Sequence, residues 1–243
     1  LSWDYPTPSD YYVVNSKTGE TKLLAGALKG NMQMSPGGKY AFGYDKVKKE
    51  WFSIEVATGS RTMLNHFKDP IWNVENDVPA LPRSYGYAGW SENDASIFLY
   101  TQFNIWKVDL NNPENPTQIT PQSKDNPVKY RYQSLERDEI FVASRMTLSA
   151  FEDNTKREGY AAVNQDGSDF KMTYEFEDLH YTGFRKSEKS ERVILRKGDF
   201  VNYPEIYYTP NLQTQPKMIS STNPQQKDYN WGSIELVSWK GKK

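Results

Sequence analysis

A polar turn that opens with serine and leads into a short apolar run occurs four times in this chain, and this repetition limits the possible folds more than any other feature. The clearest copy is Ser-Pro-Gly-Gly-Lys at 35–39, followed by an apolar run at 40–42. Proline presets the backbone of a tight turn, and glycine accepts the positive φ that ends one. A bulky apolar residue stands seven positions after each serine, in the pairs Ser35 and Phe42, Ser91 and Phe98, Ser134 and Phe141, and Ser187 and Ile194.

The spacing of these turns predicts a β-propeller. The four serines are separated by 56, 43 and 53 residues, and no segment shows helical periodicity beyond a turn or two. Repeats of that length with several short strands each are typical of propeller blades, which bury their apolar faces by stacking on one another. We therefore expect an all-β chain of about four complete blades, preceded by one partial blade.

The predicted boundaries follow from the turns. Residues 1–34 form the partial blade, the complete repeats start near 35, 90, 134 and 187, and the blades end at 222. In the third repeat we expect a strand over 139–145, a long middle loop over 148–157, and strands over 159–164 and 170–174. Elsewhere the alternation of apolar residues predicts strands at 11–15, 21–24, 40–44, 50–56, 61–64, 96–101, 105–110, 118–120, 192–196, 205–208 and 217–220.

The composition excludes several classes of protein. Seven Trp, 17 Tyr and 11 Phe in 243 residues are too many aromatics for a disordered chain. The 30 basic and 31 acidic residues give no cationic excess, so we predict no nucleic-acid partner. The absence of cysteine excludes disulfides, thiolate metal sites and a cysteine nucleophile. No stretch approaches the roughly 18 apolar residues of a membrane helix, so we predict no membrane span.

Three segments resemble a known family. Ser35–Phe42 resembles the Ser-Pro-Asp-Gly-Lys turn of TolB-like and prolyl-oligopeptidase-type propellers, and Trp90–Asp94 is similar to its Trp-Ser-Pro-Asp-Gly form. The segment 223–243, with Asn-Pro-Gln at 223–225 and an apolar run at 231–239, resembles the crossing from propeller to hydrolase domain in prolyl oligopeptidase family serine peptidases, including dipeptidyl peptidase IV-like members.

This resemblance implies a seven- or eight-bladed propeller of which the chain is the C-terminal part, with 223–243 leading toward an α/β-hydrolase domain. The Gly-x-Ser-x-Gly nucleophile elbow of that domain does not occur in the sequence. The resemblance therefore implies no catalytic residue here, and a propeller that gates peptide access to a catalytic domain of the same parent chain. The alternative is a stand-alone TolB-like propeller that binds a protein partner. The family further implies a bacterial periplasmic or secreted protein.

One segment could contact a peptide directly. Arg83 stands beside Tyr85 and Tyr87, and a planar, permanently charged guanidinium between aromatic rings can bind a peptide carboxylate or carbonyl. The alternative is an arginine packed on aromatics in a loop between blades. The two histidines, His66 and His180, have no metal-ligand spacing, so we expect them to make hydrogen bonds in loops or between blades. We predict no metal and no cofactor. Because four or five blades leave blade faces uncovered, we expect the chain by itself either to close as a small ring or to associate with itself.

Overall fold

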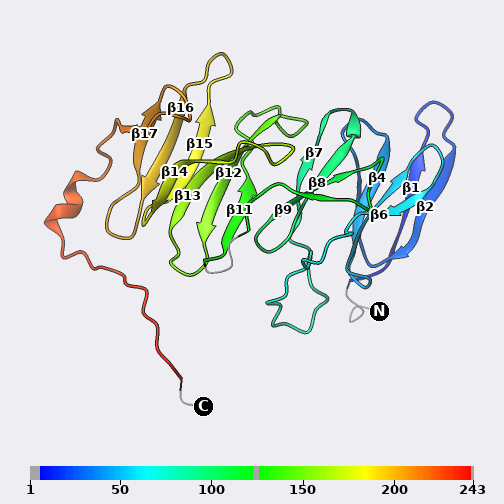
Figure 1. Ribbon diagram of the computed structural model, residues 1–243, viewed down its shortest axis with the longest axis horizontal. Helices are drawn as coiled ribbons and strands as arrows, with labels where there is room; N and C mark the ends of the chain where they lie inside the picture. The colour runs from blue at the N-terminus through cyan, green and yellow to red at the C-terminus, as the bar shows by residue number, and fades with distance from the viewer. Residues whose placement is uncertain (1–5, 123–125, 242–243) are drawn as a thin grey trace. The chain divides into compact units, whose positions relative to one another are not determined.

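The computed structural model describes residues 6–122 and 126–241 and is nearly all-β, with 42% strand and 3% helix (Figure 1). Residues 1–5, in the predicted partial blade, and 242–243, in the predicted exit segment, lie outside the described residues. The helical content consists of two 3₁₀ segments, η1 (Glu92–Asp94) and η2 (Pro224–Asp228). None of the described helical segments is long and apolar enough to cross a membrane.

In the part of the chain that the structure describes, the strands form four antiparallel sheets of four strands each, with neighbours in chain order, and one two-stranded hairpin. We call the sheets the first to fourth blades. The N-terminal hairpin comprises β1 (Ser9–Val14) and β2 (Thr21–Leu28). The first blade comprises β3 (Gly30–Met34), β4 (Tyr40–Asp45), β5 (Glu50–Glu55) and β6 (Arg61–Met63). The second comprises β7 (Tyr87–Trp90), β8 (Ser96–Tyr100), β9 (Ile105–Asp109) and β10 (Thr117–Gln118).

The third blade comprises β11 (Val128–Tyr132), β12 (Arg145–Glu152), β13 (Glu158–Asn164) and β14 (Lys171–Glu177). The fourth comprises β15 (His180–Lys186), β16 (Val193–Gly198), β17 (Glu205–Thr209) and β18 (Lys217–Met218). The predicted all-β, bladed fold is confirmed.

Each serine-initiated turn lies between the first and second strands of its blade. The first strands, β3, β7, β11 and β15, are not among the strands expected from the sequence, which started each repeat at its serine. In β3, for example, only Gly30 and Met32 are even partly buried.

The expected strand and loop of the third blade are wrong. β12 begins at Arg145 instead of 139 and runs through the first half of the segment expected to be a loop. Met146, Leu148, Ala150 and Glu152 are all buried on one face of β12, because strand side chains alternate between faces. Phe141, which the repeat placed in a strand, lies in the loop before β12 and packs against an aromatic core.

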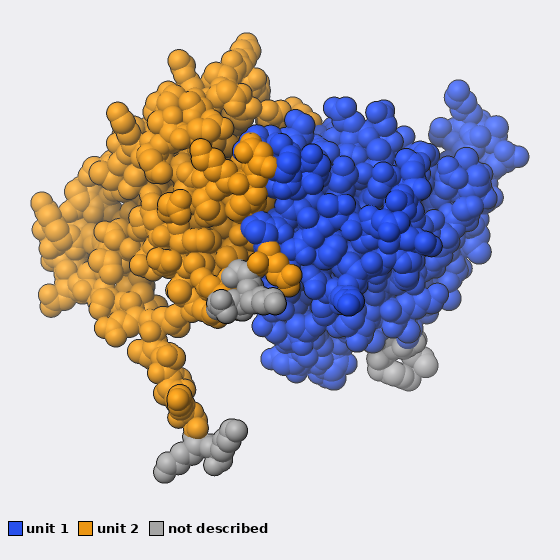
Figure 2. Space-filling model, viewed as in Figure 1, with its two compact units in different colours: residues 1–121, 140–146, 163–168 blue, residues 122–139, 147–162, 169–243 orange. Residues whose placement is uncertain are grey.

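The chain divides into two compact units, shown in different colours in Figure 2. Unit 1 comprises residues 1–121, 140–146 and 163–168, and unit 2 comprises 122–139, 147–162 and 169–243. Within unit 1, aromatic residues of the first and second blades share one core. Trp90 stacks on Tyr40 at 5.9 Å between ring centroids and meets the edge of Phe42 at 5.0 Å.

Unit 2 has a tyrosine-rich core of its own. Tyr160 and Tyr174 from the third blade pack against Tyr181 and Phe184 of β15, and the rings of Tyr174 and Tyr181 stack at 5.9 Å. Burial raises the pKa of Tyr174 to about 12, since the phenolate would lose its hydration. In both units, large aromatic surfaces on adjacent blades cover one another, which is how repeated blades bury what each alone would expose.

Candidate functional site

A backbone hydrogen bond closes the turn between the first and second strands of every blade. The number of positions that this bond spans differs between the blades. The amides of Ser35, Ser91 and Ser187 donate to the carbonyl five positions later, at 2.8–2.9 Å. In the third blade the corresponding bond joins the Gln133 amide to the Thr147 carbonyl at 2.8 Å, fourteen positions on. The third blade therefore carries a longer loop at a place where its neighbours have a tight turn.

The turn of the first blade is fixed by a carboxylate from the second. Asp94 is 1% exposed and accepts hydrogen bonds from Ser35 Oγ at 2.5 Å, from the Gly37 amide at 2.9 Å and from the Lys39 amide at 3.1 Å. Ser35 Oγ also accepts from the Tyr40 amide at 3.0 Å. We call these contacts of Asp94 with the Ser35 turn the Asp94 joint. Each polar group named here has a partner within the protein, so the joint is a structural contact between blades and does not offer a site for a ligand.

The predicted Arg83–Tyr87 segment is held against the start of its own long connection. The Asn73 amide donates to the Arg83 carbonyl at 2.8 Å, and the Tyr85 amide donates to the Ile71 carbonyl at 2.9 Å. The Tyr85 hydroxyl accepts from the Val74 amide at 3.2 Å. Arg83 is exposed, and within residues 6–122 and 126–241 its guanidinium has no hydrogen bond or ion pair.

Tyr87 lies in a different environment from Arg83 and Tyr85. It begins β7, and its ring meets the edges of Phe42 at 5.1 Å and Trp51 at 5.7 Å. Burial raises the pKa of its hydroxyl. Tyr87 thus takes part in the packing of the first and second blades, which is the alternative that the sequence left open for this segment. Arg83 is exposed, whereas Tyr85 and Tyr87 are both partly buried.

The antiparallel order of a blade fixes the end at which each loop lies. In a sheet of four antiparallel strands, the first strand begins at the end where the fourth strand stops, and the first turn lies at the opposite end. Arg83 and Tyr85 precede β7 and therefore lie at the end of the second blade where β10 stops. In the fourth blade, the tail leaves after β18 at the corresponding end.

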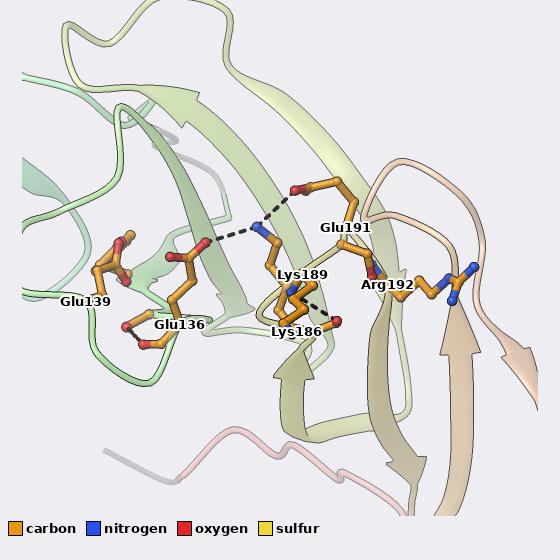
Figure 3. A network of polar contacts seen from close by, with 10 residues as sticks. Glu136, Glu139, Lys186, Lys189, Glu191 and Arg192 are labelled. Atoms are coloured by element: carbon orange, nitrogen blue, oxygen red, sulfur yellow. Dashed lines mark hydrogen bonds and ion pairs between the residues drawn. The ribbon is translucent and has the colours of Figure 1, made fainter.

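A cavity lies between the beginning of the long turn of the third blade and the end of β15 with the turn that follows it, and all of its lining residues belong to unit 2. It has a volume of about 700 Å³ and is lined by residues 134–138 and 185–188. Lys186 crosses between the two turns, and its Nζ lies 3.0 Å from Glu136 Oε1 and 3.0 Å from Glu191 Oε1 (Figure 3). Hydrogen bonds to Glu136 and then to Glu191 raise the pKa of Lys186, which is 18% exposed.

Two further hydrogen bonds hold the long turn of the third blade near its beginning. The Tyr132 hydroxyl donates to Glu139 Oε1, and Ser134 Oγ donates to the Glu136 carbonyl at 3.1 Å. Sequence reasoning missed the cavity because it treated Ser134 as the start of an ordinary turn. The available signal was the gap between Ser134 and the alternating run that begins at Met146.

His180 makes the contact between blades that was expected of it. Its Nδ1 lies 2.5 Å from Glu158 Oε1, and the other oxygen of Glu158 accepts from the Tyr181 amide at 3.1 Å. Glu158 begins β13 and His180 begins β15, so the contact joins the third and fourth blades. Over the described parts of the chain, no group of three or more His, Cys, Asp or Glu residues is arranged to hold a metal ion.

No family model matches this chain, and no curated protein matches its sequence. Solved structures do resemble it. A candidate dipeptidyl aminopeptidase IV from Bacteroides ovatus has a TM-score of 0.52 at 14% identity, covering 87% of this chain and 33% of that chain. A prolyl endopeptidase has a TM-score of 0.51 at 13% identity, covering 87% of this chain and 30% of that chain. TolB from Acinetobacter baumannii has a TM-score of 0.45 at 12% identity, covering 90% and 50%.

The chain therefore spans half or less of the length of these three proteins. At such low identity, the likeness to the two peptidase structures concerns the fold alone, and that fold is a propeller.

Proposed function

We propose that this chain is the non-catalytic propeller part of a prolyl oligopeptidase family serine peptidase, and that it gates peptide access to an α/β-hydrolase domain of the same parent protein. The segment 223–241 is the observation that carries this proposal. It follows the fourth blade, contains η2, and then continues without regular structure while exposing a series of apolar side chains: Trp231, Ile234, Leu236, Val237 and Trp239. Exposed apolar runs of this kind mark surfaces that another domain covers.

The start of this segment is attached to the fourth blade, whereas its end is not. Trp231 Nε1 donates to the Phe200 carbonyl at 2.7 Å, and the two rings lie 6.4 Å apart. Trp239, eight positions further on, is 83% exposed. This arrangement supports a crossing segment that is fixed on the propeller side and free to join the sheet of a following domain.

Arg83 and Tyr85 fit the gating role by their position. Within the second blade they lie at the end where β10 stops, and the tail leaves the fourth blade at the end where β18 stops. In the proposed parent protein, a complete ring of such blades would present these ends to the catalytic domain. Arg83 would bind a carboxylate or carbonyl of the entering peptide, with Tyr85 beside it. Tyr87, which packs on Phe42 and Trp51, would anchor this segment to the core of the first and second blades.

A serine-directed fluorophosphonate tests the proposal. This chain should take no label, and a longer protein that continues past Lys243 should be labelled, since triad chemistry requires the nucleophile of the hydrolase domain. The matched control is the longer protein with the serine of its Gly-x-Ser-x-Gly elbow changed to alanine, which should lose the label. If the continuation encodes no hydrolase domain, the proposal fails and the chain is better explained as a stand-alone propeller that binds a protein partner.

The gating role has a separate test in the longer protein. Arg83→Gln should raise KM for a peptide substrate about tenfold, the loss expected for one charge-assisted hydrogen bond, while leaving fluorophosphonate labelling unchanged. Lys68→Gln is the control, because Lys68 is an exposed cation in the same connection. If Arg83→Gln leaves KM unchanged from that of the unaltered longer protein, Arg83 does not bind the peptide.

We also propose that the chain by itself associates with further copies. The N-terminal hairpin exposes Tyr12, Val14 and Leu23, and the fourth blade exposes Ile194 and Met218. Stacked repeats need polar outer faces at their ends to stay separate, and these faces are apolar. Sedimentation at several concentrations should show species larger than a monomer, and a monomer at every concentration would contradict this proposal.

A further inference from the structure

Two arginines line the cavity of unit 2, one in the long turn of the third blade and one near the end of β15, and neither has an acidic partner among the described residues. Arg137 lies in the long turn of the third blade, and within the described chain its guanidinium forms no hydrogen bond or ion pair. Arg185 lies at the end of β15 and donates from Nη1 to the Phe184 carbonyl at 2.9 Å, without an ion pair to any described residue. Lys186, in contrast, is engaged by two glutamates. The cationic donors available to a ligand are therefore the two guanidinium groups.

The acidic residues around the same cavity restrict the kind of ligand. The lining contains three basic residues and three acidic ones, the latter being Glu136, Asp138 and Glu188. Asp138 and Glu188 form no ion pair with residues that the structure describes. A multiply charged anion would be repelled by these carboxylates, whereas a dipolar molecule meets both signs of charge. A volume of about 700 Å³ lies within the range of small-ligand sites.

We propose that this cavity binds a short peptide by its free carboxylate. The guanidinium groups of Arg137 and Arg185 present planar pairs of donors that match a carboxylate, and Asp138 and Glu188 receive the ammonium end. Leu135 supplies an apolar wall, since it packs against the tyrosine-rich core of unit 2. The choice of a peptide among dipolar ligands rests on the proposed function, but binding at this cavity requires no catalytic domain.

This site is distinct from the Arg83 segment. It lies among the first turns of the third and fourth blades, and in the fourth blade that turn is at the end opposite to the one from which the tail leaves. A peptide held here is therefore bound on the side of the fourth blade away from the exit segment. Such a site would retain peptides at the propeller before or after they pass the catalytic side.

Titration of the whole chain with tri-alanine tests the proposal, using isothermal calorimetry or amide chemical shifts. The free tripeptide should bind, and its C-terminal amide should bind about tenfold more weakly, because the charge that the arginines receive is gone. Arg137→Gln and Arg185→Gln should each weaken binding of the free tripeptide by about the same factor. Lys189→Gln is the control, since Lys189 is an exposed cation of the same turn outside the lining.

Several results would overturn the proposal. These are no binding of tri-alanine at concentrations on the order of 10 mM, equal binding of acid and amide, or variants that bind like the parent. Sensitivity to N-acetylation alone would assign the ligand to the carboxylates and also overturn it. If one arginine variant fails to fold by circular dichroism, the other decides. Fluorophosphonate labelling of the longer protein does not involve Arg137 or Arg185, so failure of this site and failure of the proposed function are told apart.

Discussion

The first turns of the first and third blades occupy the same place in their sheets, and each contains the serine of the repeated turn. They differ in length and in whether their polar groups have partners inside the protein. The turn at Ser35 closes after five positions and gives its donors to Asp94, a buried carboxylate of the next blade. The turn that follows Gln133 closes after fourteen positions and lines a cavity with charged groups. A turn whose polar groups are all satisfied inside the protein is fixed and closed to ligands, whereas a longer turn with unpaired charges at its surface can bind one.

The largest expected effect comes from removing the joint of the first turn. Asp94→Ala leaves the buried Ser35 hydroxyl and the part-buried amides of Gly37 and Lys39 without this acceptor, and the free energy of unfolding should fall by about 3 kcal/mol. Asp94→Asn should fall between the alanine variant and the parent, because asparagine keeps one acceptor and tolerates the φ of 52° found here.

The matching variant in the third turn should have almost no effect. Asp138 is exposed and unpaired among the described residues, so Asp138→Ala should change the free energy of unfolding by less than about 0.5 kcal/mol. Urea denaturation of the three variants measures the contrast. Equal losses for Asp94→Ala and Asp138→Ala would show that the two turns do not differ in the way described.

A smaller effect should follow from crowding the same joint. A Cβ at Gly37 would lie 2.8 Å from Asp94 Oδ2, so Gly37→Ala must displace the carboxylate. We expect a loss of about 1–3 kcal/mol in the free energy of unfolding, as for other overpacked buried sites. Gly26→Ala is the control, because its nearest atom would be an ordinary 3.7 Å away. A neutral Gly37→Ala would mean that the carboxylate can move without loss.

The turn between β12 and β13 of the third blade allows a further comparison, because the stability that its ion pair contributes should depend on pH. A hydrogen bond from Lys129 lowers the pKa of Asp153, whose Oδ1 lies 2.6 Å from Lys129 Nζ. A carboxyl whose folded pKa is lowered adds stability above its unfolded pKa of about 3.9, and that stability is lost as the pH falls through the folded value.

Asp153→Asn should therefore reduce the slope of unfolding free energy against pH below about pH 4. The loss at neutral pH should stay under about 1 kcal/mol, since the pair is partly exposed. Urea denaturation between roughly pH 5 and pH 3, a range that includes the unfolded pKa, measures this slope. An unchanged slope would exclude the Lys129–Asp153 pair as its source.

A small loss of stability should also follow from replacing the lysine that pairs with both turns of unit 2. Lys186→Met removes both ion pairs but keeps an apolar stem, so the free energy of unfolding should fall by about 0.5–1 kcal/mol. Lys189→Met should be neutral, because Lys189 is exposed. A loss as large as that of Asp94→Ala would show that the turns of unit 2 form a joint like that of unit 1.

Much of the fold was predictable because strand periodicity is local. The runs at Tyr40–Asp45 and Ser96–Tyr100 could be recognised from apolar residues within a few positions of a turn. The third blade was misread for the same reason: the serine pattern suggested a strand near Phe141, although the alternation that buries Met146 and Leu148 begins only at β12. The exposed position of Arg83 and the packing of Tyr87 both agree with the alternatives stated for that segment, but the sequence did not distinguish them.

The sequence by itself determined the class of architecture, since a repeated turn-and-strand unit rich in aromatics can bury its surface only by stacking. It also determined the absence of thiol chemistry and of a Gly-x-Ser-x-Gly elbow in this chain. Only the tertiary structure decided that Asp94 joins two turns more than fifty residues apart, and that Arg137 and Arg185 line one cavity. Those contacts depend on how separate blades pack, and neither local periodicity nor spacing along the chain encodes the partner of a side chain across that distance.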